Sequence, residues 1–108
     1  MNGDGEGFYD QMGFMMSVFG RNDDSTFDQK MSAEAKDFDD VTYRAVGRNW
    51  FVLSGHKGTK ILYRKLFVGS QSTNALYIEY PVATKNHYDR VVQDVSRSFR
   101  PGNLAEGH

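Results

Sequence analysis

Apolar and polar residues alternate along most of the chain in short runs that turn residues separate, a pattern typical of β-strands. We expect six strands, at about residues 7–9, 14–19, 41–46, 50–55, 60–68 and 75–80. The connecting turns and loops are expected at residues 11–13, 21–24, 47–49, 56–59 and 69–74. Pro81 ends the last strand because proline cannot donate a hydrogen bond to a β-ladder. Arg64 and Lys65 are neighbours in the middle of the fifth strand, so their side chains should lie on opposite faces of the sheet.

The first of two helical segments is expected over about residues 26–37. Apolar residues recur in it at helical spacing, and charged residues are expected to point outward. The apolar positions are Phe27, Met31, Ala35 and Phe38, and the outward ones are Lys30, Glu34 and Lys36. Ser25, with Asp28 three residues later, resembles the capping box that begins many helices.

The second helix is expected over about residues 86–98, where the amphipathic pattern is clearest. Its apolar stripe consists of Tyr88, Val91, Val92, Val95 and Phe99, and its polar face of Asp89, Arg90, Gln93, Asp94 and Arg97. Pro101 and Gly102 follow the stripe and would end the helix. Three β-branched valines lower its intrinsic helicity, so we expect packing to stabilise it.

The resulting order of elements, ββαββββα, predicts an α+β fold in which both helices pack on an antiparallel β-sheet. Short connections favour antiparallel neighbours, and each amphipathic helix needs a sheet to cover. We expect one domain over residues 2–101 and a disordered tail over residues 102–108, because the tail has no periodicity. Its final Gly107-His108 is interpreted as the remnant of a purification tag, and Met1 as an addition to a trimmed chain.

Composition limits the classes of protein and of chemistry. A chain of 108 residues with 39% hydrophobic residues can form one modest core, which excludes a disordered or collagen-like chain. The absence of cysteine excludes thiol catalysis, iron–sulfur clusters and cysteine-rich zinc sites. No apolar run approaches the roughly 18–20 residues of a membrane span. We therefore expect a domain without a membrane span of its own.

The formal net charge of −1 hides an asymmetry between the two halves of the chain. Residues 1–40 have ten acidic and three basic side chains (−7), and residues 41–108 have ten basic and four acidic ones (+6). A basic half can bind a polyanion such as nucleic acid. The basic residues are spread through the predicted strands rather than clustered, so we favour two halves that attract each other within the fold and expect no nucleic-acid partner.

Candidate metal ligands occur in two places. The glycine- and acid-rich residues 2–7 look like part of an EF-hand loop, but Gln11 would stand where a bidentate Glu is needed. His87 and Asp89 could supply two ligands, whereas a site needs three or four. We therefore predict no metal or other cofactor. A metal- or small-ligand-binding domain remains the alternative function, with ligands from Asp4, Glu6, Asp10, Asp23 and Asp24, or from His87 and Asp89.

No arrangement typical of an enzyme is present. Ser54 and His56 lie close in sequence, but an acidic residue in a position to orient the histidine is not evident. His56 is expected in a hairpin turn. The chain also has no G-x-S-x-G motif and no phosphate-binding glycine loop that opens a helix. We therefore predict that the domain is not an enzyme.

Aromatic and basic residues alternate on the predicted strands. The aromatic residues are Tyr43, Trp50, Phe51, Tyr63, Phe67, Tyr77 and Tyr80, and the basic ones are Arg44, Arg48, Arg64 and Lys65. Packing in the core and across strands is the leading interpretation, with a protein or ligand surface and base stacking as alternatives. Trp, Tyr and Arg dominate interface hot spots. Our candidates for a protein interface are therefore Arg48, Trp50, Tyr63 and Arg64.

Several segments resemble an uncharacterised domain of alphaproteobacterial proteins. They are VTYR (41–44), NWFVLSG (49–55), ILYRK (61–65), YP (80–81), YD (88–89), SRSFRP (96–101), NGDG (2–5) and VFGRN (18–22). The likeness covers about residues 2–101. That family is in turn similar to the Mog/PsbP-like α/β/α sandwich, named for a Ran-binding protein and a photosystem II extrinsic subunit.

The resemblance implies an antiparallel sheet between helical layers and an accessory or binding role rather than catalysis. It also implies an exported or membrane-anchored protein, in which this domain can sit beside an enzymatic one. PsbP-type proteins are linked to metals and membrane partners, but this chain shows no matching ligand set. We therefore expect a non-enzymatic module of otherwise unknown function that binds a protein partner in the periplasm.

Overall fold

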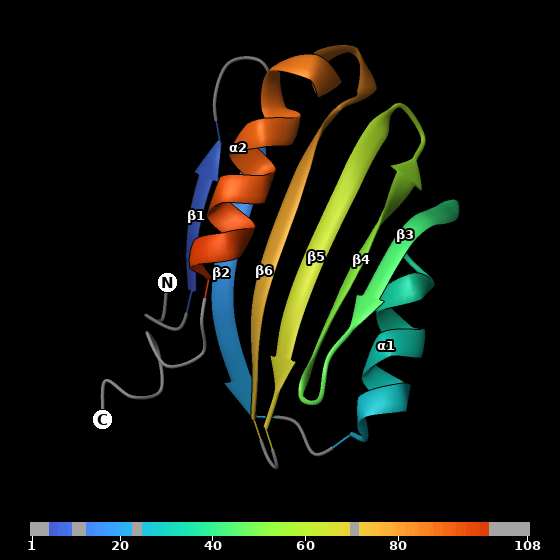
Figure 1. Ribbon diagram of the computed structural model, residues 1–108, viewed down its shortest axis with the longest axis vertical. Helices are drawn as coiled ribbons and strands as arrows, with labels where there is room; N and C mark the ends of the chain where they lie inside the picture. Colours follow the sequence, from blue (N-terminus) through green and yellow to red (C-terminus); the bar gives the residue numbers. More distant parts are fainter. Residues whose placement is uncertain (1–4, 10–12, 23–24, 70–71, 100–108) are drawn as a thin grey trace.

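The computed structural model describes residues 5–9, 13–22, 25–69 and 72–99, which form an α+β domain (Figure 1). Six strands and two helices follow one another along the chain. In chain order they are β1 (Gly5–Tyr9), β2 (Met15–Asn22), α1 (Phe27–Ala35), β3 (Asp40–Val46), β4 (Trp50–Lys57), β5 (Lys60–Val68), β6 (Ser72–Pro81) and α2 (Lys85–Ser98). A single 3₁₀ turn, Val82–Thr84, links β6 to α2. The α+β class predicted from the sequence is confirmed.

The strands form one antiparallel sheet in the order β1-β2-β6-β5-β4-β3. Strand β6 lies between β2 and β5, so the chain leaves β2, forms α1 and begins again at the far edge with β3 (Figure 1). Strands β3, β4, β5 and β6 then follow as neighbours, as tight turns dictate. The two edges of the sheet are therefore β1 and β3.

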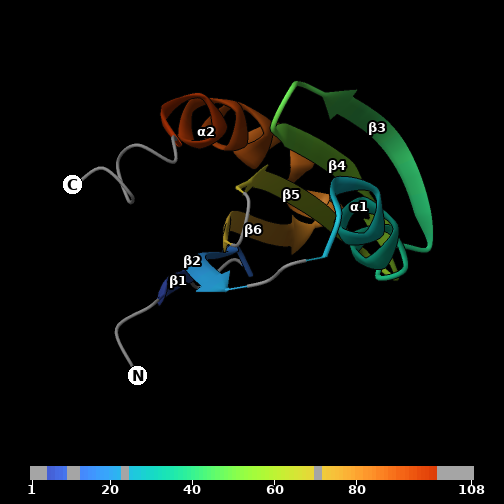
Figure 2. The ribbon, with the colours of Figure 1, turned by 90° about the horizontal axis from the view of Figure 1, so that it is seen from below.

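The two helices cover opposite faces of the sheet, and each face has its own apolar cluster (Figure 2). The cluster under α2 consists of Phe14, Ile61, Leu76, Ile78, Tyr80, Tyr88, Val92 and Phe99. The cluster on the α1 face consists of Phe38, Phe51, Leu53, Leu62, Leu66 and Ala75, with Phe27, Met31 and Ala35 of α1 packed against it. Alternate residues of β5 and β6 supply the two clusters, as the two-residue period of a strand requires, and β4 supplies Phe51 and Leu53 to the α1-face cluster. Arg64 and Lys65 accordingly lie on opposite faces, as predicted.

A β-bulge shapes the start of β3. The pairing register with β4 shifts between Val41 and Tyr43, so Thr42 is the extra residue. Gly55 lies opposite the bulge, and a Cβ atom there would come 2.0 Å from the carbonyl oxygen of Asp40. Only glycine lets the two backbones approach this closely. The sheet then curves so that β3 bends round α1 (Figure 2).

Some predicted boundaries were wrong, because polar residues that suggest loops are paired in strands. Ser72, Thr73 and Asn74 belong to β6, where Thr73 is fully buried and pairs with Val68 of β5. Arg21 and Asn22 extend β2 by the same pairing with β6. His56 lies in β4 rather than in the following turn, because Lys57 and Lys60 are the residues that close that hairpin. Residues 11 and 12 of the turn expected at 11–13, the expected tail at 102–108, and Pro101, expected to help end the second helix, lie outside the described residues.

Two predictions about α1 were also wrong. The capping box is formed one residue later than expected, with the Thr26 hydroxyl accepting from the Gln29 N–H and the Gln29 side chain accepting from the Thr26 N–H. Lys30 and Glu34, expected to point outward, are both buried. A buried charge needs a partner. The Lys30 ammonium donates to the carbonyl of Ser25, and the partners of Glu34 come from the sheet, as described below.

The second helix follows its predicted stripe except at two positions. Tyr88, Val92 and Phe99 are buried, but Val91, one member of the stripe, is 40% exposed at its edge. Asp89, predicted on the solvent face, is half-buried because its carboxylate accepts from the Tyr80 hydroxyl at 3.0 Å. The helix therefore binds the sheet through polar as well as apolar contacts.

Candidate functional site

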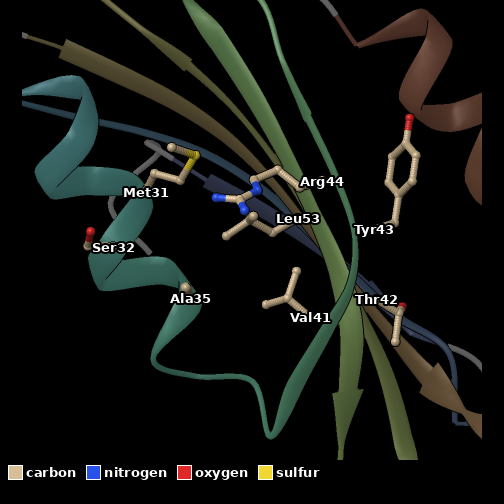
Figure 3. Close-up of a pocket in the computed structure, with 8 residues that line it drawn as sticks. All are labelled: Met31, Ser32, Ala35, Val41, Thr42, Tyr43, Arg44 and Leu53. Carbon is tan, nitrogen blue, oxygen red and sulfur yellow. The ribbon is translucent and has the colours of Figure 1, made fainter.

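A cleft of about 410 Å³ lies between α1 and the β3 edge of the sheet (Figure 3). Its lining residues are Met31, Ser32, Ala35, Val41, Thr42, Tyr43, Arg44 and Leu53. Figure 3 shows the side chains of Met31 and Ala35 on the helical side and those of Val41, Arg44 and Leu53 facing them from the sheet. The bend of β3 round α1 therefore leaves an open space between the strand and the helix.

Arg44 gives this mostly apolar cleft a positive charge. Its guanidinium extends from β3 toward α1 (Figure 3), and Arg44 lines the cleft together with Met31 of that helix. None of the eight lining residues is acidic. Within the described ranges, Arg44 forms no hydrogen bond or ion pair with another side chain. An exposed guanidinium presents five N–H donors that suit a carboxylate or phosphate.

Strand β3 leaves one side of its backbone without a neighbouring strand. The N–H of Gly47 donates to the carbonyl of Trp50 at 2.8 Å and closes the hairpin with β4. Bonding alternates along an antiparallel pair, so the backbone groups of Ala45 and Tyr43 face β4. The backbone N–H and C=O groups of Arg44 and Val46 therefore face away from β4. Their side chains lie on the α1 face, because each is paired with a residue of the α1-face cluster, Leu53 or Phe51.

Apolar side chains on β3 are unusually exposed. Val41 is 38% exposed, Tyr43 57% and Val46 53%. Natural proteins usually protect an edge strand with charges, proline, bulges or a covering segment. The bulge at Thr42 protects only the beginning of β3. The rest of the strand, from Tyr43 to Val46, is a regular and partly apolar edge with one charged side chain, Arg44.

Arg64, which pairs with the cleft residue Leu53, holds α1 to the sheet through one buried ion pair and one partly exposed ion pair. Its Nη1 donates to Glu34 Oε1 at 2.9 Å and to a carboxylate oxygen of Asp37. The guanidinium lies 4.1 Å from the ring centroid of Tyr77, whose hydroxyl donates to Glu34. Burial opposes the charged form of Arg64, but Asp37, Tyr77 and Glu34 outweigh it and raise the pKa of the guanidinium. Arg64 is therefore a structural residue, with only 12% of its side chain exposed.

Tyr63 and Trp50 lie on the opposite face, beside α2. The Tyr63 hydroxyl shares a hydrogen bond with that of Ser96, and burial raises the pKa of Tyr63. Lys65 donates to the Ser96 carbonyl at 2.9 Å, and its ammonium lies 5.6 Å from the ring centroid of Trp50. Both aromatic rings are half-buried. This face therefore anchors α2.

The four residues predicted as a protein interface do not form one surface. Trp50 and Tyr63 lie on the α2 face, Arg64 is enclosed under α1, and Arg48 is exposed in the β3–β4 turn. The sequence pattern had included Arg44 among the basic residues of the strands but did not distinguish it from Arg64. The distinguishing feature is strand order: Arg64 is on a central strand, and Arg44 is on an edge.

Metal ligands do not come together in the part of the chain that the structure describes. No group of three or more His, Cys, Asp or Glu side chains occurs there that could hold a metal ion. His87 is exposed, and Asp89 is engaged with Tyr80 and with Lys85, whose ammonium is 2.7 Å away. Glu6 lies in β1. The other acidic candidates, Asp4, Asp10, Asp23 and Asp24, lie outside the described residues.

Comparisons with known proteins matched this chain to no protein family, no curated protein and no solved structure. The resemblance to the Mog/PsbP-like proteins therefore stays a prediction. No helix among residues 5–9, 13–22, 25–69 and 72–99 is long and apolar enough to cross a membrane. The cleft beside α1 and the exposed edge of β3 are the features from which function is inferred.

Proposed function

We propose that this domain is a non-enzymatic interaction module that binds a protein partner through β3 and the adjoining cleft. The observation that carries the proposal is the edge strand itself. Strand β3 presents the outward-facing backbone groups of Arg44 and Val46 and the exposed side chain of Val46, next to a cleft of about 410 Å³. Exposed apolar surface with polar residues around it is typical of interaction sites. A partner bound at this surface would therefore form backbone hydrogen bonds with β3, apolar contacts with Val46 and an ion pair with Arg44.

The detailed fold assignment and the cellular location of the protein are part of the same proposal. We assign the domain to the Mog/PsbP-like α/β/α sandwiches on the sequence resemblance, and the placement of α1 and α2 on opposite faces supports three layers. With that assignment goes an accessory role in an exported or periplasmic protein, which can be longer than this domain and anchored to a membrane. The partner itself is a protein of unknown identity.

Binding of a small acidic ligand is the second candidate function. The volume of the cleft lies in the range of about 300–1,000 Å³ typical of ligand sites, and Arg44 would bind the acid. The edge strand favours a protein partner over a small molecule, because a small ligand would leave the outward backbone groups of β3 unused.

A selection from random nine-residue peptides displayed on phage tests the proposed function. Val46→Pro removes an outward N–H while the bonds between β3 and β4 remain, and Val46→Lys places a charge on the same edge. Val91→Lys is the matched control, because Val91 is a similarly exposed valine on α2. Peptides enriched on the wild type should be lost on both Val46 variants and retained on Val91→Lys. No enrichment, or equal retention on the Val46 variants, would overturn the proposal.

A further inference from the structure

We infer that β3 binds an extended segment of its partner as a seventh strand, and that Arg44 recognises a carboxylate on that segment. This inference rests on the proposed function and specifies its ligand: an extended peptide with an acidic and an apolar residue two positions apart. Strand addition of this kind uses main-chain hydrogen bonds for affinity and alternate side chains for specificity.

The spacing follows from the geometry of β3. Arg44 and Val46 are the residues of its regular part whose backbone groups face outward, and both place their side chains on the α1 face. A residue directly opposite each of them on an added antiparallel strand would have its side chain on that same face. The residue opposite Val46 would meet an exposed valine, and the residue opposite Arg44 would meet a guanidinium over the cleft.

Charge complementarity identifies the residue opposite Arg44 as acidic. The carboxylates nearest in sequence are already engaged: Asp37 with Arg64, Asp39 with Lys57 and the Gly58 N–H, and Asp40 with His56. Glu34 also binds Arg64. The cleft thus contains a cation with no acidic lining residue. An opposite charge directly across a strand pair stabilises it, and a like charge destabilises it.

A second copy of this chain fits the edge less well than an acidic peptide does. Two β3 strands related by a two-fold axis at residue 44 would place Arg44 against itself. An axis at residue 45 would place Arg44 against Val46 of the second copy, which supplies no carboxylate. The regular edge between Tyr43 and Val46 is also short, about 13 Å at 3.3 Å per residue. It suits a short peptide better than a stable dimer interface of about 1,200–2,000 Å².

A charge swap tests this inference. Peptides from the selection on the wild type would be synthesised with their acidic residue as Glu, Gln or Lys, and binding to the full chain measured by fluorescence anisotropy. We expect Glu→Lys and Arg44→Glu each to weaken binding at least about tenfold, and the combination of the two to restore most of it. Arg90→Glu, which changes an exposed arginine on α2, should leave binding unchanged.

The outcomes separate this inference from the proposed function. Peptides that lack acidic residues, or that bind Arg44→Glu as well as they bind the wild type, would overturn the role of Arg44 while leaving a protein-binding edge. No enriched peptide at all would overturn both. A dimer that Val46→Lys dissociates, and with which the peptides do not compete, would assign the edge to a second copy. Binding of free glutamate as tight as that of the peptides would favour a small ligand.

Discussion

Arg64 and Glu34 meet between the sheet and α1, with the Arg64 Nη1 atom 2.9 Å from Glu34 Oε1. Thirty residues separate them in sequence, and both are largely enclosed, with side-chain exposures of 12% and 7%. Tyr77 completes the arrangement, because its ring lies against the guanidinium and its hydroxyl binds Glu34. The contact fixes the position of α1 on the sheet, and therefore the width of the cleft beside β3.

Removal of either Arg64 or Glu34 should lower the free energy of unfolding strongly. Arg64→Ala leaves Glu34 buried without its main partner, a change that typically costs about 3–5 kcal/mol. Replacement of both by apolar residues, Glu34→Leu with Arg64→Met, should restore much of the loss because no charge remains buried. Urea denaturation of the two variants measures both effects. Arg90→Ala is the control and should change the free energy of unfolding by less than about 0.5 kcal/mol. A loss below about 1 kcal/mol for Arg64→Ala would contradict a structural role for Arg64.

The Arg64–Glu34 pair also shows which kind of contact the sequence alone does not predict. The helical period placed Phe27, Met31 and Ala35 on the sheet side of α1, and they do pack there. It also assigned Glu34 to solvent, because a charged residue is exposed unless a partner is present. The partner of Glu34 comes from β5, and no local pattern connects the two segments. Buried ion pairs of this kind depend on tertiary structure.

Strand order set a second limit on prediction from the sequence. Alternation located all six strands, and it placed Arg64 and Lys65 on opposite faces. It could not tell that β6 lies between β2 and β5, and so could not tell that β3 is an edge. The segment that contains Tyr43 and Arg44 looks like any half-buried strand. Its side chains line a cleft rather than a core because β3 has a neighbouring strand on one side only.

The stability of the domain should fall at alkaline pH. Burial, with the hydrogen bond to Asp89, raises the pKa of Tyr80 above its ordinary value of 10.0, and burial also raises the pKa of Tyr63. The folded state therefore holds these protons more tightly than the unfolded chain does. Their contribution to stability is fully present below pH 10 and is lost as the pH rises through the folded pKa values.

Tyr80→Phe should reduce this decline without abolishing it, since Tyr63 remains. Urea denaturation at about pH 8 and about pH 11 would measure the free energy of unfolding of both proteins. The wild type should lose more stability between the two values than the variant does. Equal losses would mean that Tyr80 ionises as easily in the folded protein as in the unfolded chain.

Gly55 should be required for the bulge that begins β3. A Cβ atom at this position would lie 2.0 Å from the Asp40 carbonyl oxygen and 2.9 Å from the Cα of Val41, so Gly55→Ala forces the strands apart. We expect a loss of about 3 kcal/mol, at the upper end for overpacking. Gly58→Ala, in an open turn with a φ of +61°, is the control and should cost about 1 kcal/mol. Thermal denaturation compares them, and equal stability of the two variants would be evidence against close approach at Gly55.

Amide hydrogen exchange at Arg44 and Val46 tests the role of β3 most directly. Their N–H groups face away from β4, so in the free protein they should exchange at least about tenfold faster than the N–H of Ala45, which faces β4. Addition of a peptide selected on the wild type should slow exchange at Arg44 and Val46 and leave residues of α2 unaffected. Unchanged exchange at both amides with the peptide bound, or protection confined to another part of the chain, would show that the partner binds elsewhere.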